Sequence, residues 1–256
     1  MHTTARQTSD RDDGTHQSVV APREPNRLLA ALPAEEYARI IGDFEPVELV
    51  ARQVLWKADA PIRSIYFPRT CVCSLLMPLS DEQPVESATT GREGMVGVPV
   101  LLGVDSSSNS CVAQISGEAL RVDADRVREW MRGHGALPPL LLRYAEALLE
   151  QTAQSVACNR RHEMEERCAR WLLMTHDRVG SDSFVLTHEF LAWMLGVRRA
   201  SVTVAAGMLQ KAGLLRYSRG RITILDREGL EAASCECYRA VRERYAKTLG
   251  MQEPKA

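Results

Sequence analysis

The residues with the clearest chemical potential in this sequence are two adjacent arginines and a nearby serine, Arg198, Arg199 and Ser201. Arginine is the usual bidentate partner of guanine O6 and N7 in the major groove of DNA. A second basic pair, Arg219 and Arg221, lies in the short segment SRGR, where arginine side chains can contact phosphate oxygens. The types and spacing of these residues therefore indicate contact with duplex DNA.

The elements that must position these side chains can be predicted from the residues around them. A first helix is expected from Thr187 to about residue 195, and a second from Arg198 or Arg199 to about residue 211, with Gly196 at the turn between them. Two short helices joined at a glycine form a helix-turn-helix. The strand-like segments 214–217 and 222–225 then predict a hairpin, or wing, with the SRGR segment at its tip.

The order of these features matters because basic residues also occur on ordinary surface helices. The alternative interpretation is a helical hairpin whose arginines are solvated surface charges. A helix cap, a tight turn, a basic helix start and a wing in this order favour DNA binding instead. The Thr187 hydroxyl and the amides at the start of its helix are then candidates for holding a phosphate.

The charge of the chain is unevenly distributed. The 256 residues carry a net charge of −1, yet residues 26–156 have 12 Lys and Arg against 17 Asp and Glu, whereas residues 157–229 have 12 against 8. The basic second part is the candidate for contact with a polyanion. Residues 1–25 are polar and predict a disordered arm without the apolar run of a secretory signal, and no stretch is apolar enough to cross a membrane. We therefore expect a cytoplasmic protein without a membrane partner.

Residues 26–137 are expected to form a β-roll that acts as a sensor-like domain. After a helical start, residues 46–125 contain six or more short runs rich in Val, Ile, Leu and Tyr, separated by Pro, Gly, Asp and Ser. Residues 138–160 then predict a long dimerisation helix, residues 161–229 the winged helix-turn-helix domain, and residues 230–256 a helical tail. A helix that packs only on its own domain is the alternative for residues 138–160. The apolar stripe that favours dimerisation comprises Leu141, Ala145, Leu148, Leu149, Thr152 and Val156.

The segment LTHEFLAWMLGVRRASVTVAAGMLQKAGLLRYSRGRITILD resembles the DNA-binding motif of the Crp/Fnr superfamily of bacterial transcription regulators. The β-roll segments IYFP, GREGMVG and LLG carry a looser resemblance. The resemblance implies an α+β fold: a jelly roll like that of cyclic-nucleotide-binding domains, a long dimerisation helix and a winged helix-turn-helix. It also implies a homodimer on a near-palindromic operator, with RNA polymerase and an unknown small-molecule effector as further candidate partners.

The resemblance also shows where this chain departs from the family. The base-reading pattern Arg-Glu-x-x-x-Arg keeps its first residue as Arg199, but Ala200 and Val204 replace the other two. Members that bind a cyclic nucleotide have a Gly-Glu pair and an Arg-Ser pair in the roll, where this chain has Gly97-Val98 and Asn109-Ser110. Because asparagine cannot replace arginine at a phosphate, we expect a degenerate effector pocket and no dependence on a cyclic nucleotide. The residues assigned to this pocket are Gly94, Gly97, Asn109, Ser110 and Thr152.

The remaining candidates for chemistry are the cysteines, which number seven. An odd number in a chain expected to be cytoplasmic argues against a disulfide framework, and residues 1–70 lack the cysteines of an iron–sulfur site. The Cys-x-Cys spacing is unusual for zinc, so we expect core packing for Cys71 and Cys73. A redox-sensitive surface pair is one interpretation of Cys235 and Cys237, whose redox role the sequence leaves open. No metal, no cofactor and no enzymatic activity are therefore expected. The competing hypothesis is a ligand-binding β-roll module that acts through protein contacts.

Overall fold

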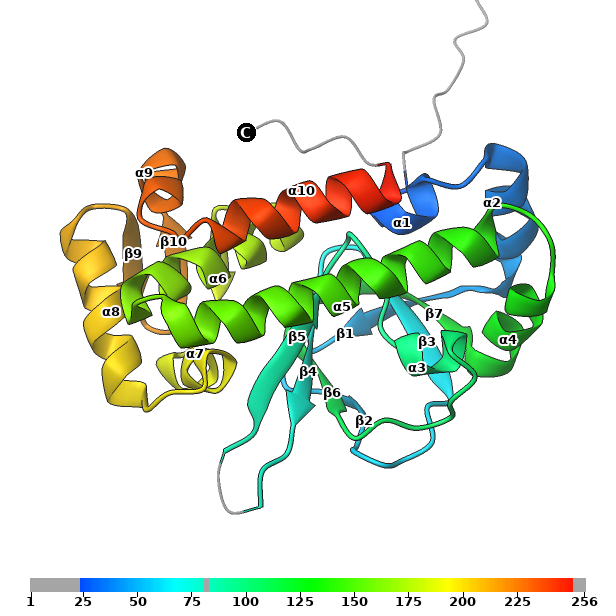
Figure 1. Cartoon of the computed structure of the whole chain (residues 1–256), viewed down its shortest axis with the longest axis horizontal. Helices are drawn as coiled ribbons and strands as arrows, with labels where there is room; N and C mark the ends of the chain where they lie inside the picture. The colour runs from blue at the N-terminus through cyan, green and yellow to red at the C-terminus, as the bar shows by residue number, and fades with distance from the viewer. Residues whose placement is uncertain (1–23, 81–82, 251–256) are drawn as a thin grey trace, which may run out of the picture.

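The computed structural model describes residues 24–80 and 83–250, and Figure 1 shows their arrangement. The predicted arm of residues 1–25 lies outside the described residues except for its last two. A β-roll comes first, a long helix crosses it, and a second group of helices with a small sheet follows. The predicted α+β fold of a β-roll, a long helix and a winged helix-turn-helix is confirmed.

The β-roll consists of two antiparallel sheets, with strand orders β1-β7-β3 and β2-β6-β4-β5. Alternating apolar residues of these short strands fill the space between the sheets, where Ile65, Phe67 and Leu120 are almost completely buried. The strands are β1 (Glu45–Leu49), β2 (Val54–Trp56), β3 (Ser64–Pro68), β4 (Val72–Met77), β5 (Val85–Thr90), β6 (Ser110–Ile115) and β7 (Gly117–Asp123). The helices around the roll are α1 (Arg27–Ala30), α2 (Ala34–Ile40), the 3₁₀ helix η1 (Ile41–Asp43), α3 (Val98–Leu101) and α4 (Ala124–Arg132).

The long helix α5 (Leu137–Arg161) agrees closely with the predicted span 138–160. Prolines in its first turn suit a helix start, because the amide that proline lacks would have no partner there. One side of α5 packs on the roll. The other side exposes Leu142, Leu149 and Val156, with exposed fractions of 46%, 65% and 69%.

The exposed apolar residues of α5 differ from those predicted for the dimerisation stripe. Leu149 and Val156 are exposed and Thr152 is half-buried, as a surface stripe requires, but Leu141, Ala145 and Leu148 are buried inside the chain. The apolar residues of α5 lie on two faces of the helix, one packed inside the chain and one directed outward. Sequence periodicity alone does not show which residue belongs to which face. Leu142 belongs to the outward face and was not in the predicted set.

The C-terminal part contains the predicted winged helix-turn-helix. It consists of α6 (Met164–Val179), β8 (Ser183–Val185), α7 (His188–Leu195), α8 (Arg199–Lys211), β9 (Leu215–Ser218) and β10 (Arg221–Ile224). The turn after α7 is made by Gly196, whose φ of +62° is a left-handed conformation that glycine adopts without strain. The three strands form one antiparallel sheet in the order β8-β10-β9, so the predicted hairpin gains a third strand.

The tail after the wing forms two helices, α9 (Arg227–Ala232) and α10 (Cys237–Leu249), rather than the single helix expected from residue 230. α10 packs along α5 and thereby returns the chain to the first half of the molecule (Figure 1). Among the described residues, none of the helices has the length and apolar character needed to span a bilayer.

Candidate nucleic-acid interface

The start of α8 presents the predicted base-reading residues to solvent. Arg198 is the N-terminal cap residue, and Arg199 opens the helix; both, like Ser201, are exposed. The opposite face of α8 buries Val202, Ala205, Ala206 and Leu209, which fixes the helix on the core of the C-terminal part. Burial of this face leaves the arginines on the outer side of the second helix of the motif, the side that reads base edges in helix-turn-helix proteins.

The middle of the same outer face is less basic than its start. Val204 is 60% exposed and Met208 is 48% exposed, although both are apolar. Val204 is the residue that replaces the second arginine of the family pattern. An apolar side chain at this place can contact the methyl group of thymine but cannot donate to guanine. The exposed face of α8 is therefore compatible with a half-site different from the family's usual one.

Thr187 holds the first helix of the motif at its start. Its Oγ1 accepts a hydrogen bond of 3.2 Å from the amide of Phe190, as the predicted cap requires. The adjacent His188 joins three elements, since its Nδ1 lies 3.1 Å from the Thr203 hydroxyl on α8 and its ring stacks on Tyr217 of β9 at 4.1 Å. Burial, with the positive charge of Arg199, lowers the pKa of His188, so a neutral ring is favoured near pH 7. Sequence reasoning missed this contact because its members lie on three different elements.

The wing presents its arginines on an exposed tip. Arg219 adopts a left-handed φ of +50° ahead of Gly220, and both Arg219 and Arg221 are exposed. The structure adds Arg216, which lies with Arg221 in a shallow groove on one face of the β9–β10 hairpin. Residues two apart on a strand share a face, and in the hairpin Arg221 pairs with Ser218 and Thr223 with Arg216. The alternation of the two strands could therefore have predicted that Arg216 lies on the same face as Arg221.

The roll lies beside the helix-turn-helix motif. Pro84 and the first residue of β5, Val85, form one wall of a cleft whose other wall includes Gly196 and Arg198. An exposed ion pair of 3.7 Å between Arg52 and Glu189 also joins the two parts. In this arrangement the first half of the chain contacts the motif directly.

The residues assigned to the degenerate effector pocket contact other residues of this chain. A Cβ on Gly94 would lie 2.0 Å from the Tyr144 ring, and one on Gly97 would lie 2.2 Å from Ile65, so both glycines permit close packing. The side-chain oxygen of Asn109 lies 3.3 Å from the Ser87 hydroxyl, and the adjacent Ser110 opens β6. On α5, the Thr152 hydroxyl donates to the carbonyl of Leu148 at 2.9 Å.

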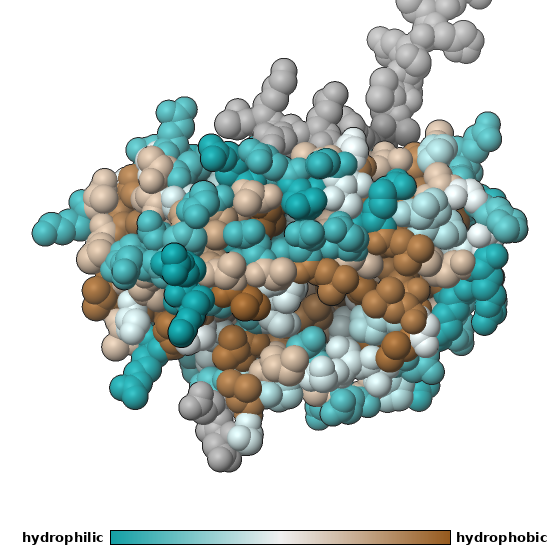
Figure 2. Space-filling view, viewed as in Figure 1, coloured by the Kyte–Doolittle hydropathy of each residue, from teal (hydrophilic) through white to brown (hydrophobic). Residues whose placement is uncertain are grey.

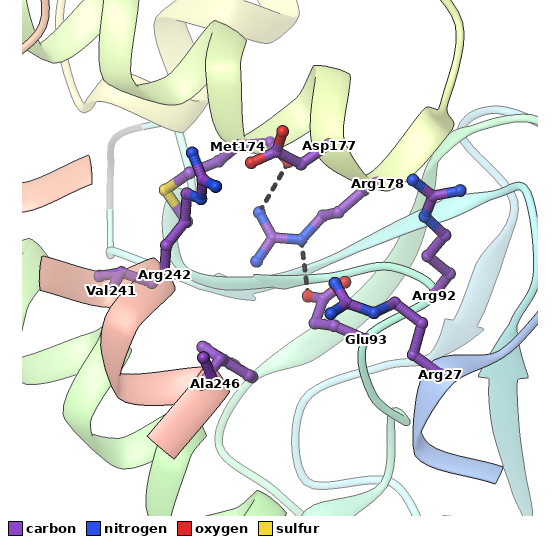
Figure 3. Close-up of a pocket in the computed structure, with 10 residues that line it drawn as sticks. Arg27, Arg92, Glu93, Met174, Asp177, Arg178, Val241, Arg242 and Ala246 are labelled. Carbon is purple, nitrogen blue, oxygen red and sulfur yellow. Dashed lines mark hydrogen bonds and ion pairs between the residues drawn. The ribbon is translucent and has the colours of Figure 1, made fainter. Parts of the chain in front are cut away.

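A buried ion pair connects the roll to α6 and was not predicted. The guanidinium of Arg178 donates to Glu93 at 2.6 Å and to Gln151 on α5 at 2.8 Å. Figure 3 shows Arg178 directed at Glu93 in a small pocket of about 70 Å³ that is also lined by Arg27 and Arg92. Burial, the largest single influence, would lower the pKa of Arg178, but Glu93 together with Tyr245 and Glu86 raises this pKa overall, so the arginine stays charged.

Comparison with known proteins identifies the C-terminal part. Residues 166–233 match the family described as "Crp-like helix-turn-helix domain". Residues 166–233 are a Crp-like helix-turn-helix domain. No curated protein gives a significant match to the sequence. The Crp-like domain includes α7, the turn and α8, together with the wing.

Solved structures extend the likeness to the rest of the fold. A CRP-family transcriptional regulator from Thermus thermophilus has a TM-score of 0.60 at 15% identity, and the match covers 82% of this chain and 100% of that one. FixK2 from Bradyrhizobium japonicum has a TM-score of 0.63 at 16% identity, with coverage of 75% and 98%. The c-di-GMP-responsive global regulator CLP of Xanthomonas campestris has a TM-score of 0.57 at 15% identity, with coverage of 75% and 99%. Together with the Crp-like domain, these matches confirm the resemblance to the Crp/Fnr superfamily.

Proposed function

We propose that this chain is a homodimeric, sequence-specific DNA-binding regulator of transcription that acts in the cytoplasm, performs no enzymatic reaction and does not depend on a cyclic nucleotide. The observation that carries the proposal is the exposed basic start of α8, where Arg198 and Arg199 project from a helix whose opposite face is buried. Arg199 is assigned to a guanine, with Arg198 and Ser201 beside it. Thr187, Arg219 and Arg221 are assigned to phosphates.

The dimer is proposed to form through α5. Its exposed apolar residues Leu142, Leu149 and Val156 follow one another at intervals of seven, which is the repeat of a two-helix coiled coil. Figure 2 shows apolar side chains along the course of α5 on the face in view. A two-fold dimer of this kind binds a near-palindromic operator when its two copies of α8 lie about 34 Å apart, which is one turn of DNA.

The absence of cyclic-nucleotide dependence is supported by the chemistry of the roll. The positions of the ribose and phosphate partners hold Val98 and Asn109, which offer neither a carboxylate nor a guanidinium. Asn109 is also engaged with Ser87 inside the roll. The proposal also includes an effector of different chemistry and a contact with RNA polymerase, and it assigns no residues to either. The domain boundaries proposed are residues 26–137, 138–160, 161–229 and 230–256.

Selection of the purified chain against a random pool of DNA duplexes, at two salt concentrations, tests this function. We expect enrichment of a two-fold symmetric site and weaker binding at the higher salt concentration, because phosphate contacts release counterions. A roll module that acts through protein contacts predicts no salt-dependent duplex binding. If no sequence is enriched either with or without cyclic nucleotides, the proposed function is wrong.

A further inference from the structure

Four side chains that are common metal ligands converge at the end of α5. They are Cys158, His162, Cys235 and Cys237, and their donor atoms all lie within 4.8 Å of one another. The sulfurs of Cys158 and Cys235 are 3.5 Å apart, and the sulfur of Cys237 is 3.5 Å from Nδ1 of His162. The four residues belong to neither the DNA-binding face nor the pocket assigned to an effector.

Two distant segments of the chain build this group. Cys158 lies in the last turn of α5, and His162 is the residue directly after the end of that helix. Cys235 lies between α9 and α10 and Cys237 opens α10, and the packing of α10 along α5 brings both to the end of α5. The sequence concealed the site because the Cys-x-Cys pair lacks the usual zinc spacing and the other two ligands lie about 75 residues earlier.

The cysteines are more buried than the sequence suggested. Cys158, Cys235 and Cys237 have exposed fractions of 0%, 4% and 1%, so the interpretation of Cys235 and Cys237 as a surface pair is wrong. They pack with one another in a small group separate from the main apolar core. All three are free thiols. Apolar packing on the main core does not account for this group of sulfurs, whereas binding of one metal ion by all of them does.

The spacing of the donors fits a single zinc ion. Zinc in a Cys₃His site is tetrahedral, with Zn–S near 2.3 Å and Zn–N near 2.0–2.1 Å, which places ligand sulfurs about 3.8 Å apart. The 3.5 Å between the sulfurs of Cys158 and Cys235 is close to that value. An iron–sulfur cluster needs its ligands spread around several irons, and calcium or magnesium prefers oxygen ligands.

The groups around the four ligands also match a metal site. Nε2 of His162 lies 3.2 Å from a carboxylate oxygen of Glu236, which would fix the ring with Nδ1 directed at the ion. The side-chain amide of Gln154 donates to the sulfur of Cys237 at 3.0 Å. A zinc ion with three thiolates has a net charge of −1, and the guanidinium of Arg170, 6% exposed and with its Nε lacking a partner, lies near Cys158. A nearby positive charge of this kind stabilises an anionic centre.

We propose that Cys158, His162, Cys235 and Cys237 bind one Zn²⁺ ion, which fastens the α9–α10 segment to the end of α5. Binding forms three Zn–S bonds and one Zn–N bond, and the thiol protons pass to solvent. The ion would hold the chain at the junction where α5 ends at His162 and α6 begins. It would therefore fix the position of the Crp-like domain relative to the long helix.

Titration of the reduced, metal-free full-length chain with Co²⁺ and then Zn²⁺ tests the site directly. We expect one Co²⁺ per chain, with the intense visible absorption of a tetrahedral thiolate complex, and its loss when Zn²⁺ displaces the cobalt. Metal analysis of the zinc-loaded chain should give one ion per chain, and its Tm should exceed that of the metal-free chain. These readouts do not involve DNA, so they remain valid if the proposed function is wrong.

Variants locate the ion. Cys237→Ser and His162→Gln should each weaken zinc binding by more than about 10-fold, since even loss of an outer hydrogen bond to a ligand costs 10–100-fold. Cys168→Ala, which removes a buried cysteine of α6 outside the group, should bind zinc as the unchanged chain does. Failure of the reduced, folded chain to bind either metal overturns the proposal. So does equal zinc binding by Cys237→Ser and the unchanged chain, or an octahedral cobalt spectrum.

Discussion

The Nε–H of Arg178 donates a hydrogen bond of 2.6 Å to Oε1 of Glu93, and both side chains are almost fully buried. Arg178 lies on α6 of the Crp-like domain, whereas Glu93 belongs to the loop between β5 and α3 of the roll. The same guanidinium reaches Gln151 on α5, so one side chain joins the roll, the long helix and the DNA-binding part.

Removal of one partner of this pair should cost more stability than removal of the pair. Arg178→Met leaves the buried Glu93 carboxylate without the guanidinium that donates to it, and we expect a loss of about 3–5 kcal/mol in the free energy of unfolding. The double variant Arg178→Met with Glu93→Gln should lose less than Arg178→Met alone, because no uncompensated charge remains. Urea unfolding of both variants measures the difference.

An exposed pair supplies the control for this measurement. Arg239 and Glu243 lie 3.6 Å apart on α10, with side chains 78% and 63% exposed. Arg239→Met should cost less than about 1 kcal/mol, since exposed pairs are screened by water and salt. If Arg178→Met costs no more than Arg239→Met, the buried pair does not stabilise the junction.

Replacement of Leu149 by a charged residue should separate the proposed dimer. Leu149 is 65% exposed on α5, and in a coiled coil its partner copy would bury it. Leu149→Glu should shift the chain from dimer to monomer in sedimentation experiments while its helix content stays unchanged. Val50→Glu, at a 60% exposed position in the roll, serves as the control and should remain dimeric. A dimer that persists in Leu149→Glu would place the interface elsewhere.

The contact between Glu86 and Trp171 should make stability depend on pH near neutrality. The indole Nε1–H of Trp171 donates to Oε1 of Glu86 at 3.0 Å, while the buried Oε2 has no partner. Burial raises the pKa of Glu86 to about 7. The folded chain thus binds this proton more tightly than the unfolded chain does, so the carboxyl contributes a loss of stability as pH rises from about 4.5 to 7.

Glu86→Gln should remove this pH dependence. The variant should match the unchanged chain near pH 5 and exceed it at pH 8, by on the order of 3 kcal/mol at most. Urea unfolding at both pH values gives the comparison. Glu48→Gln, an exposed carboxyl on β1, should show the same pH dependence as the unchanged chain. An equal gain for Glu86→Gln at both pH values would contradict the assigned pKa.

The order of elements was predictable because local signals determine it. Thr187 caps its helix and Gly196 makes the turn, and each of these depends only on residues nearby in the chain. The contacts between the halves were not predictable, since Glu93 and Arg178 are 85 residues apart and each is ordinary in its own segment. The two faces of α5 were mixed for a related reason: Leu148 and Leu149 have the same hydropathy, and only the packing of other elements on α5 buries Leu148 and leaves Leu149 exposed.

Removal of an arginine from α8 and removal of one from the wing should have different effects on DNA binding. Arg199, at the start of α8, is assigned to a base, so Arg199→Ala should cost about 1–3 kcal/mol of discrimination at one base pair of the half-site. Arg219, at the wing tip, is assigned to a phosphate, so Arg219→Ala should weaken binding to all sequences alike and reduce the salt slope by about 1. Competition binding with the selected operator and single-base variants, at several salt concentrations, separates the effects. Arg239→Ala on the exposed side of α10 should change neither quantity. If Arg199→Ala leaves the sequence preference unchanged, α8 does not read the operator through this residue.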